Sequence, residues 1–192
     1  PYEYCEWGEE KRRTFVTEKL GLEYDSVADM ATIVSMENAA IETAAYDEIT
    51  VTAVATASLE VNGGRVGEKT TSYEKHGKSI DLQPGTINII VATNADMTPG
   101  CMARVIVTAT EAKTAAIQEL MAGSLHSSGI ATGSGTDNMM VIANAESDNL
   151  LTYAGKHGKL GELIGLTVMR AVKQALKQHM GLSQESQHTM LA

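Results

Sequence analysis

A short polar loop at residues 132–137 carries the side chains best suited to bind a ligand or to act on one. Its sequence is TGSGTD, and apolar residues follow directly. Glycines let the backbone approach a ligand with its N–H groups exposed, and Asp137 could orient a histidine or activate water. The remaining loop residues are hydroxyl-bearing or glycine: Thr132, Gly133, Ser134, Gly135 and Thr136. The simpler alternative is a glycine-rich turn in which Asp137 bonds its own backbone.

A second segment, GKHGKLGELIG at residues 155–165, places His157 between two lysines and two glycines. Lys156 and His157 come just before an expected helix, where positive charge is disfavoured by the helix dipole. A bound anion, or Glu162, would relieve that cost. Because the ordinary pKa of histidine lies near neutrality, His157 could serve as a general acid-base. The alternative is a solvated helix cap rich in lysine.

Weaker candidates lie elsewhere in the chain. Arg104, Glu111 and Gln118 recur every seven residues on an otherwise apolar helix, which indicates a polar stripe that is paired or lines a cavity. A structural ion pair would explain Glu111 equally well. Asn94 and Asp96 follow a strand, where open α/β sheets bind ligands.

Two further histidines and a cysteine are simpler to interpret as residues without a catalytic role. We expect His76 and His126 to lie exposed in loops. Cys101 stands at a helix N-terminus, where the pKa of a thiol falls, but a small buried residue is the simpler interpretation.

The pattern along the chain predicts helices at 9–21, 98–121 and 159–180, the second buried on most sides and the third long and amphipathic. Gly21 and Gly181 should end the first and third helices, and Thr98 should cap the second. Strands are expected at 30–36, at 40–46 and 49–54 around an Asp47-Glu48 hairpin, at 87–93 and at 139–143. Residues 62–79 read as an exposed loop, and Pro84-Gly85 as a turn. We therefore predict an α+β or α/β fold with one mixed sheet flanked by helices, including a strand-helix-strand unit with parallel strands over residues 86–143.

Length and composition narrow the functional class. The 192 residues, 43% hydrophobic, suit one domain over residues 1–182, and we expect residues 183–192 to be a disordered tail. Two cysteines without metal-ligand spacing predict a cytoplasmic protein without a disulfide framework. A net charge of -9 disfavours nucleic acid, and no apolar run is long enough for a membrane. A homo-oligomer stays open, because helix 98–121 could pack inside the domain or at a dimer interface.

Several long motifs, taken in order, resemble the adenosylcobinamide amidohydrolase (CbiZ) family. They are SMENAAIE, VTAVATASLEVNGGRVGE, GTINIIVATNADMTPG, EAKTAAIQEL, SSGIATGSGTD and AGKHGKLGELIG. The resemblance covers about residues 31–176, and residues 1–30 match only loosely. It implies hydrolysis of one amide of adenosylcobinamide, which frees aminopropanol and leaves adenosylcobyric acid in corrinoid salvage. The corrinoid is then the substrate, and no cofactor is expected. The family's members also imply a further N-terminal segment before Pro1.

Amide cleavage needs an activated nucleophile, stabilisation of an oxyanion and a proton for the departing amine. We predict that His157 is the acid-base and that Asp137 is its partner or the base for water. Thr136 or Ser134, with the loop N–H groups, would hold the oxyanion, or Thr136 would itself be the nucleophile. The remaining predicted site residues position the substrate or tune the histidine: Glu111, Lys113, Lys156, Glu162, Asn94, Thr132, Gly133 and Gly135. No zinc cluster is apparent, although a carboxylate-bound metal stays open.

Two further functions stay open beside this one. The first is a corrinoid-binding module without activity, and the second is an amidase for another small amide. A visible-spectrum shift without amine release would indicate the module, and the absence of corrinoid binding would indicate the other amidase.

Overall fold

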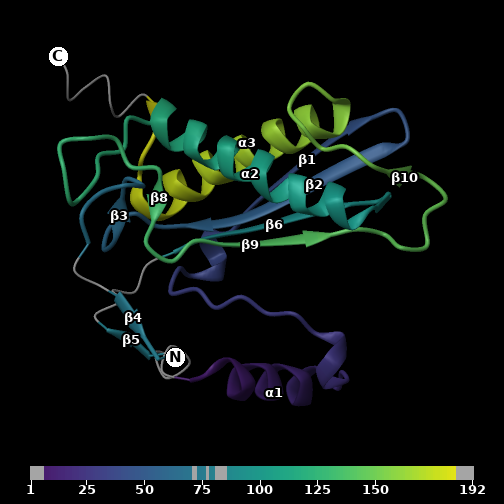
Figure 1. The fold of residues 1–192 in the computed structure, drawn as a ribbon, viewed down its shortest axis with the longest axis horizontal. Coiled ribbons are helices and arrows are strands. Elements are labelled where there is room, and N and C mark those ends of the chain that lie inside the picture. Colours follow the sequence, from purple (N-terminus) through teal and green to yellow (C-terminus); the bar gives the residue numbers. More distant parts are fainter. Residues whose placement is uncertain (1–6, 71–72, 77, 81–85, 185–192) are drawn as a thin grey trace.

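A computed structural model describes residues 7–70, 73–76, 78–80 and 86–184. Its centre is a four-stranded mixed sheet in the order β1-β2-β6-β9. The strands are β1 (Ala40–Tyr46), β2 (Ile49–Ala57), β6 (Ile87–Thr93) and β9 (Asn138–Ile142). β1 pairs antiparallel with β2 and β2 with β6, whereas β6 and β9 are parallel. The predicted mixed sheet and its parallel pair are confirmed, and the fold is α+β (Figure 1).

The hairpin of β1 and β2 forms where the alternating pattern predicts it. Tyr46 pairs with Ile49 around a two-residue turn, in which Asp47 takes the left-handed conformation at φ 52°. Aspartate tolerates this region better than most residues, so it suits a tight hairpin. Along β2, Val51, Ala53 and Ala55 are fully buried, as expected for the strand face that points into the core.

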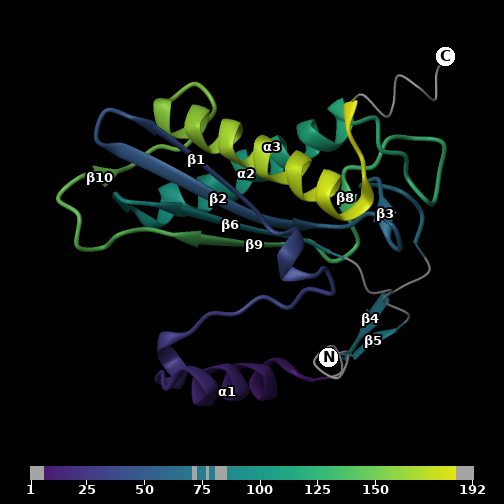
Figure 2. The same ribbon diagram turned by 180° about the vertical axis from the view of Figure 1, so that it is seen from behind.

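Two long helices cover that face of the sheet. They are α2 (Pro99–Glu119), which connects β6 to β9, and α3 (Lys159–Met180), which packs on β1, β2 and α2. Figure 2 shows α3 lying along the β1–β2 hairpin. The Thr98 hydroxyl accepts from the Cys101 N–H at 3.2 Å, and Gly181 ends α3 in the left-handed conformation, so the predicted cap and stop are confirmed. No helix in the described part of the chain is long and apolar enough to span a membrane.

The prediction that α2 is buried on most sides is wrong. Its inner side packs on the sheet and α3, but Ile106 and Val107 on the outer side are 46% and 43% exposed. The few charged residues of this helix gave too little contrast to show which side faces water. β9 is likewise an edge strand and only partly buried, where a buried strand was expected.

The second face of the sheet is open over most of its area. Ile41 on β1 and Ile142 on β9 point to this side and are 66% and 44% exposed. Below it in Figure 1 runs an N-terminal arm with helix α1 (Glu9–Leu20) and the 3₁₀ turns η2 (Tyr24–Ser26) and η3 (Met36–Asn38). The predicted first helix and its Gly21 cap are confirmed.

The strand predicted at residues 30–36 is wrong. This segment is irregular and is tied to one end of the sheet by side chains. The Asn88 amide donates to the Ala31 carbonyl at 2.7 Å, and Thr56 donates to Thr32 at 3.4 Å. Apolar residues gave the segment a strand-like appearance, yet Ile33 and Met36 are exposed at 43% and 66%, and the segment pairs with no strand of the sheet.

Short strand pairs organise the connections, so the reading of residues 62–79 as a plain exposed loop is wrong in part. β3 (Gly63–Gly64) pairs with β8 (Gly133–Ser134), and β4 (Tyr73–Lys75) pairs with β5 (Lys78–Ile80). β7 (Asp96–Met97) pairs with β10 (Leu150–Leu151). The predicted Pro84-Gly85 turn and all but residues 183 and 184 of the predicted tail lie outside the described residues, and the single-domain boundary stays a prediction.

Candidate active site

The TGSGTD loop lines a large pocket, which we call the polar pocket. Its volume is about 930 Å³, and residues 61–70 form the wall next to the loop. α2 supplies a third side, and His126 comes from the connection after α2. The pairing of β3 with β8 sets this arrangement, because Gly63 and Gly64 lie directly against Ser134 and Gly133. The pocket is lined by Val61, Asn62, Gly64, Arg65, Val66, Glu68, Lys69, Thr70, Thr110, Lys113, Thr114, His126 and residues 132–137.

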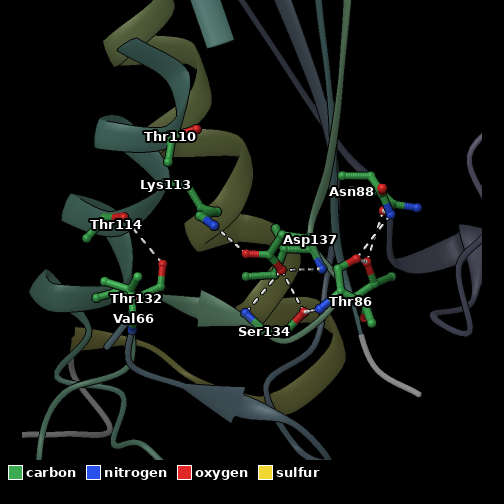
Figure 3. A network of polar contacts seen from close by, with 12 residues as sticks. Val66, Thr86, Asn88, Thr110, Lys113, Thr114, Thr132, Ser134 and Asp137 are labelled. Atoms are coloured by element: carbon green, nitrogen blue, oxygen red, sulfur yellow. Dashed lines mark hydrogen bonds and ion pairs between the residues drawn. The ribbon is translucent and has the colours of Figure 1, made fainter. Parts of the chain in front are cut away.

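Asp137 is the anchor of the loop. One carboxylate oxygen accepts from the Ser134 N–H at 3.0 Å, the Ser134 hydroxyl at 2.6 Å and the Ile87 N–H at 3.1 Å. The other oxygen forms an ion pair with Lys113 (Figure 3). These donors stabilise the anion and use much of its accepting capacity. The carboxylate therefore fastens the loop to both β6 and α2.

Lys113 brings a positive charge to the inner wall of the pocket. The residue is only 9% exposed, and its ammonium group is held over the loop by Asp137. A Cβ on Gly133 would lie 2.7 Å from the Lys113 Nζ and closer still to the Asp137 carboxylate. Glycine at position 133 is thus required by the ion pair that crosses it. An ammonium group has three donors, so Lys113 can bond a ligand oxygen while it keeps Asp137.

Hydroxyl groups tie the loop to both neighbouring walls. The Thr132 hydroxyl accepts from the Val66 N–H at 2.9 Å, and Thr114 donates to the Thr132 carbonyl at 3.3 Å. The Thr136 carbonyl accepts from the Thr86 hydroxyl at 2.6 Å. The loop therefore has a fixed shape before any ligand enters (Figure 3).

A cluster of hydrogen bonds around Glu68 joins residues 65–68 of the pocket wall to residues 124–127. Its carboxylate accepts from the Ser127 hydroxyl, from the Arg65 N–H at 3.0 Å and from the Ser124 hydroxyl at 2.7 Å. These bonds, the one from Ser127 first, lower the pKa of Glu68. The His126 N–H donates to the same Ser124 hydroxyl at 3.0 Å, which places His126 beside the cluster.

The second segment singled out by the sequence lies elsewhere. His157 and Lys156 are exposed at the start of α3 and are not among the residues that line the polar pocket. The expected pairing of His157 with Asp137 is therefore wrong, because Asp137 bonds Lys113, Ser134 and Ile87 instead. The segment's glycines serve packing. The Tyr153 ring lies against Gly155 and Gly158, and a Cβ on Gly161 would meet the backbone of Gly155.

Glu111, Lys156 and Glu162 form surface ion pairs. The Lys156 Nζ lies 3.9 Å from Glu111, and Lys159 pairs with Glu162 at 2.6 Å. Glu111 and Lys113 are two positions apart, which turns their side chains about 200° from each other around the helix. Of this predicted group, only Lys113 lines the pocket.

Asn94 lies at the far end of the sheet. Asp137 bonds the first residue of β6, whereas Asn94 follows the last one, about 20 Å away along the strand. The Asn94 amide bonds the β1–β2 turn, through the Thr50 N–H and the Glu48 carbonyl, each at 2.8 Å. The structure thus gives Asn94 a place in the hairpin and does not bring it to the pocket.

The pocket wall at residues 61–70 and His126 were missed as site residues. The signal for the wall was present in the stretch NGGRVGE, in which adjacent glycines allow two backbones to pack closely. Cys101 is fully buried, and burial raises the pKa of its thiol, which agrees with its interpretation as a small buried residue. Among the described residues, no group of three His, Cys, Asp or Glu could hold a metal ion.

Comparison with known proteins identifies a family for this chain. A family model described as adenosylcobinamide amidohydrolase (CbiZ) matches residues 3–184. The chain is 39% identical over 172 residues to "Uncharacterized protein MJ1613" of Methanocaldococcus jannaschii, a match that covers 84% of this chain and 67% of that protein. The chain therefore belongs to the adenosylcobinamide amidohydrolase family.

Proposed function

We propose that this protein hydrolyses the aminopropanol amide of adenosylcobinamide in the polar pocket. The products would be adenosylcobyric acid and free aminopropanol, a step of corrinoid salvage in the cytoplasm. Membership of an amidohydrolase family supports the reaction class. The observation that carries the choice of site is a buried lysine, Lys113, held by Asp137 in a pocket of about 930 Å³.

The chemistry of the pocket suits a bulky substrate that carries many amides. Amide hydrolysis places negative charge on the carbonyl oxygen in its transition state, and a positioned ammonium group stabilises that charge. We assign this role to Lys113. The hydroxyls of Thr132, Ser134 and Thr136 would bond the neighbouring amides of the corrinoid.

The charge of the pocket differs from that of the whole chain. Although the protein has a formal net charge of -9, the pocket's two acids are matched by basic groups: Arg65, Lys69 and Lys113 face Glu68 and Asp137. Acidity of the whole chain therefore does not explain binding of a cationic corrinoid at this site. Shape and hydrogen bonding would have to provide it.

The roles predicted for His157, Glu111, Lys156 and Glu162 are not part of this proposal, because none of these residues lines the pocket. The proposal needs no resident cofactor or metal. A homo-oligomer stays a prediction.

The proposal is tested by mixing the pure protein with adenosylcobinamide. Visible spectra report corrinoid binding, and chromatography reports adenosylcobyric acid and aminopropanol. We expect both a spectral shift and stoichiometric product. A shift without product would instead identify a corrinoid-binding module, and the absence of both would leave an amidase for another small amide.

A further inference from the structure

One titratable group of the polar pocket has no role so far. His126 lies in the connection between α2 and the TGSGTD loop and lines the pocket. Building on the proposed function, we propose that His126 is the acid-base residue of this site, in place of His157. It would take a proton from the attacking water and return it to the departing amine.

The loop that carries His126 is held from both sides. At its base, Gly123 and Ile130 form an isolated antiparallel bridge, and the Ser124 N–H donates to the Gly129 carbonyl at 2.8 Å. Next to His126, the Leu125 N–H donates to the Gly63 carbonyl at 2.9 Å, which joins the loop to β3. The backbone around His126 is therefore fixed against β3, in the pocket wall at residues 61–70.

The imidazole ring lies over a glycine of that wall. A Cβ on Gly64 would come within 3.4 Å of the His126 Cδ2, so the ring uses the space that Gly64 leaves open. Gly64 also accepts from the Thr132 N–H through its carbonyl, at 2.8 Å. His126 and the TGSGTD loop thus meet at the same residue of β3, and this contact directs the ring to the pocket side of the loop.

The charges around His126 suit a group that gains and loses a proton. The wall at residues 61–70 contributes Glu68, Arg65 and Lys69. Lys113 comes from α2, and Asp137 from the TGSGTD loop. Glu68 is held as an anion by three donors and its pKa is lowered, so it stays negative when His126 is protonated. Arginine and lysine ordinarily keep their protons at neutral pH, whereas histidine exchanges its proton there.

The proposed step balances with water as the only co-reactant. The imidazole takes a proton from water while the water oxygen bonds the amide carbon, and Lys113 stabilises the charge that develops on the carbonyl oxygen. The imidazolium then gives that proton to the amide nitrogen as the C–N bond breaks. The carboxylic acid and the amine leave, and His126 is neutral again.

The test compares His126→Gln with His157→Gln, each measured for aminopropanol release between pH 5 and 9 and for corrinoid binding by visible spectroscopy. For His126→Gln we expect kcat to fall by about 100-fold or more while Kd for adenosylcobinamide changes little. The wild-type rate should change with pH over this range, and this dependence should be lost in the variant. His157→Gln should keep the wild-type rate and profile.

Two outcomes overturn the inference in different ways. Wild-type turnover and an unchanged profile in folded His126→Gln would reject His126 alone and leave the proposed function standing. No product from the wild-type protein would reject the proposed function and His126 with it. Thermal melting of both variants shows that each is folded, which we expect because His126 and His157 are exposed at the surface of the fold.

Discussion

At the scale of single residues, Asp137 and Lys113 explain the composition of the TGSGTD loop. Asp137 receives its donors from Ser134 within the loop, from Ile87 on β6 and from Lys113 on α2. Ser134 therefore contributes twice, through its N–H and its hydroxyl. Gly133 leaves the space in which the ion pair forms. The loop is polar for a structural reason as well as a functional one, because its own side chains hold its shape.

Replacing Gly133 by alanine should break this arrangement. The new Cβ would lie 2.7 Å from the Lys113 Nζ and closer to Asp137, so the buried pair would have to separate. We expect a loss of about 1–3 kcal/mol in the free energy of unfolding, measured by urea denaturation, together with loss of corrinoid binding. Gly135→Ala is the matched control, since its Cβ would meet only the Asn62 side chain, at 3.4 Å. Equal stability of the two variants would contradict this account.

At the residue scale, the sequence pointed to the TGSGTD loop, which lines the polar pocket, and to His157, which does not. TGSGTD and Lys113 could be selected because polar groups next to apolar segments need partners. The pairing of Lys113 with Asp137 could not be predicted, because the parallel β6–α2–β9 connection brings together residues 24 positions apart. His157 attracted attention through its glycine neighbours, yet those glycines accommodate the Tyr153 ring and α3. His126 has no such local signal.

At the scale of elements, a glycine allows the start of α3 to pack closely against the backbone of residues 154–155. Gly161 faces the 154–155 backbone, where a Cβ would lie 2.9 Å from the Ala154 carbonyl oxygen and closer to Gly155. Gly165, one turn later, has no atom within 4 Å of an added Cβ. The two glycines of this helix therefore differ in what their surroundings require. Close packing requires the first glycine, and nothing in the described surroundings requires the second.

This contrast predicts opposite signs for two identical substitutions. Gly161→Ala should lower the free energy of unfolding by about 1–3 kcal/mol, because the start of α3 must move away from residues 154–155. Gly165→Ala should raise it by up to about 1 kcal/mol, because alanine favours the helix over glycine. Urea denaturation of both variants measures the difference. Destabilisation by Gly165→Ala, or tolerance of Gly161→Ala, would show that α3 is not packed as described.

The Glu68 cluster makes the contact between residues 65–68 and residues 124–127 depend on pH. Hydrogen bonds from Ser127, the Arg65 N–H and Ser124 lower the pKa of Glu68, so the anion stabilises the join above the ordinary glutamate pKa of about 4.3. That stabilisation is lost as the pH falls through the lowered folded value. We expect amide hydrogen exchange in residues 124–130, corrected for intrinsic rates, to accelerate as the pH falls below the ordinary glutamate pKa. In Glu68→Gln the protection should be weak at neutral pH and show no such step. A step of unchanged size in that variant would assign the effect to another group.

At the scale of the whole molecule, periodicity predicted the packed centre and failed at the periphery. β1, β2, β6, α2 and α3 lie where the pattern placed them, because each buries one side in this centre, although the pattern along α2 did not show which side faces water. The segment 30–36 failed because its apolar residues follow no sheet edge. The short pairs β3–β8 and β7–β10 could not be predicted, since two-residue strands carry no period and depend on distant partners.

The N-terminal arm should be separable from this centre. Among the residues that the structure describes, its ion pairs and ring contact join arm residues to each other: Arg12 and Arg13 pair with Asp29, and Trp7 packs edge-to-face on Phe15. Deleting residues 1–26 should therefore change the free energy of unfolding by about 1 kcal/mol or less. Deleting residues 1–38 removes in addition the bonds of Ala31, Thr32 and Asn38 to the centre and should cost more. A large loss in the shorter deletion, measured by urea denaturation, would show that α1 stabilises the centre.

The most direct test of the central claim is the rate of aminopropanol release from adenosylcobinamide by Lys113→Met. Lys173→Met serves as control, because Lys173 is also ion-paired on a helix, to Glu119, but lies outside the pocket. If the polar pocket is the active site, Lys113→Met should lose about 100-fold or more in rate, while Lys173→Met keeps the rate of the wild-type protein. Wild-type turnover by folded Lys113→Met would place the chemistry elsewhere and contradict the account.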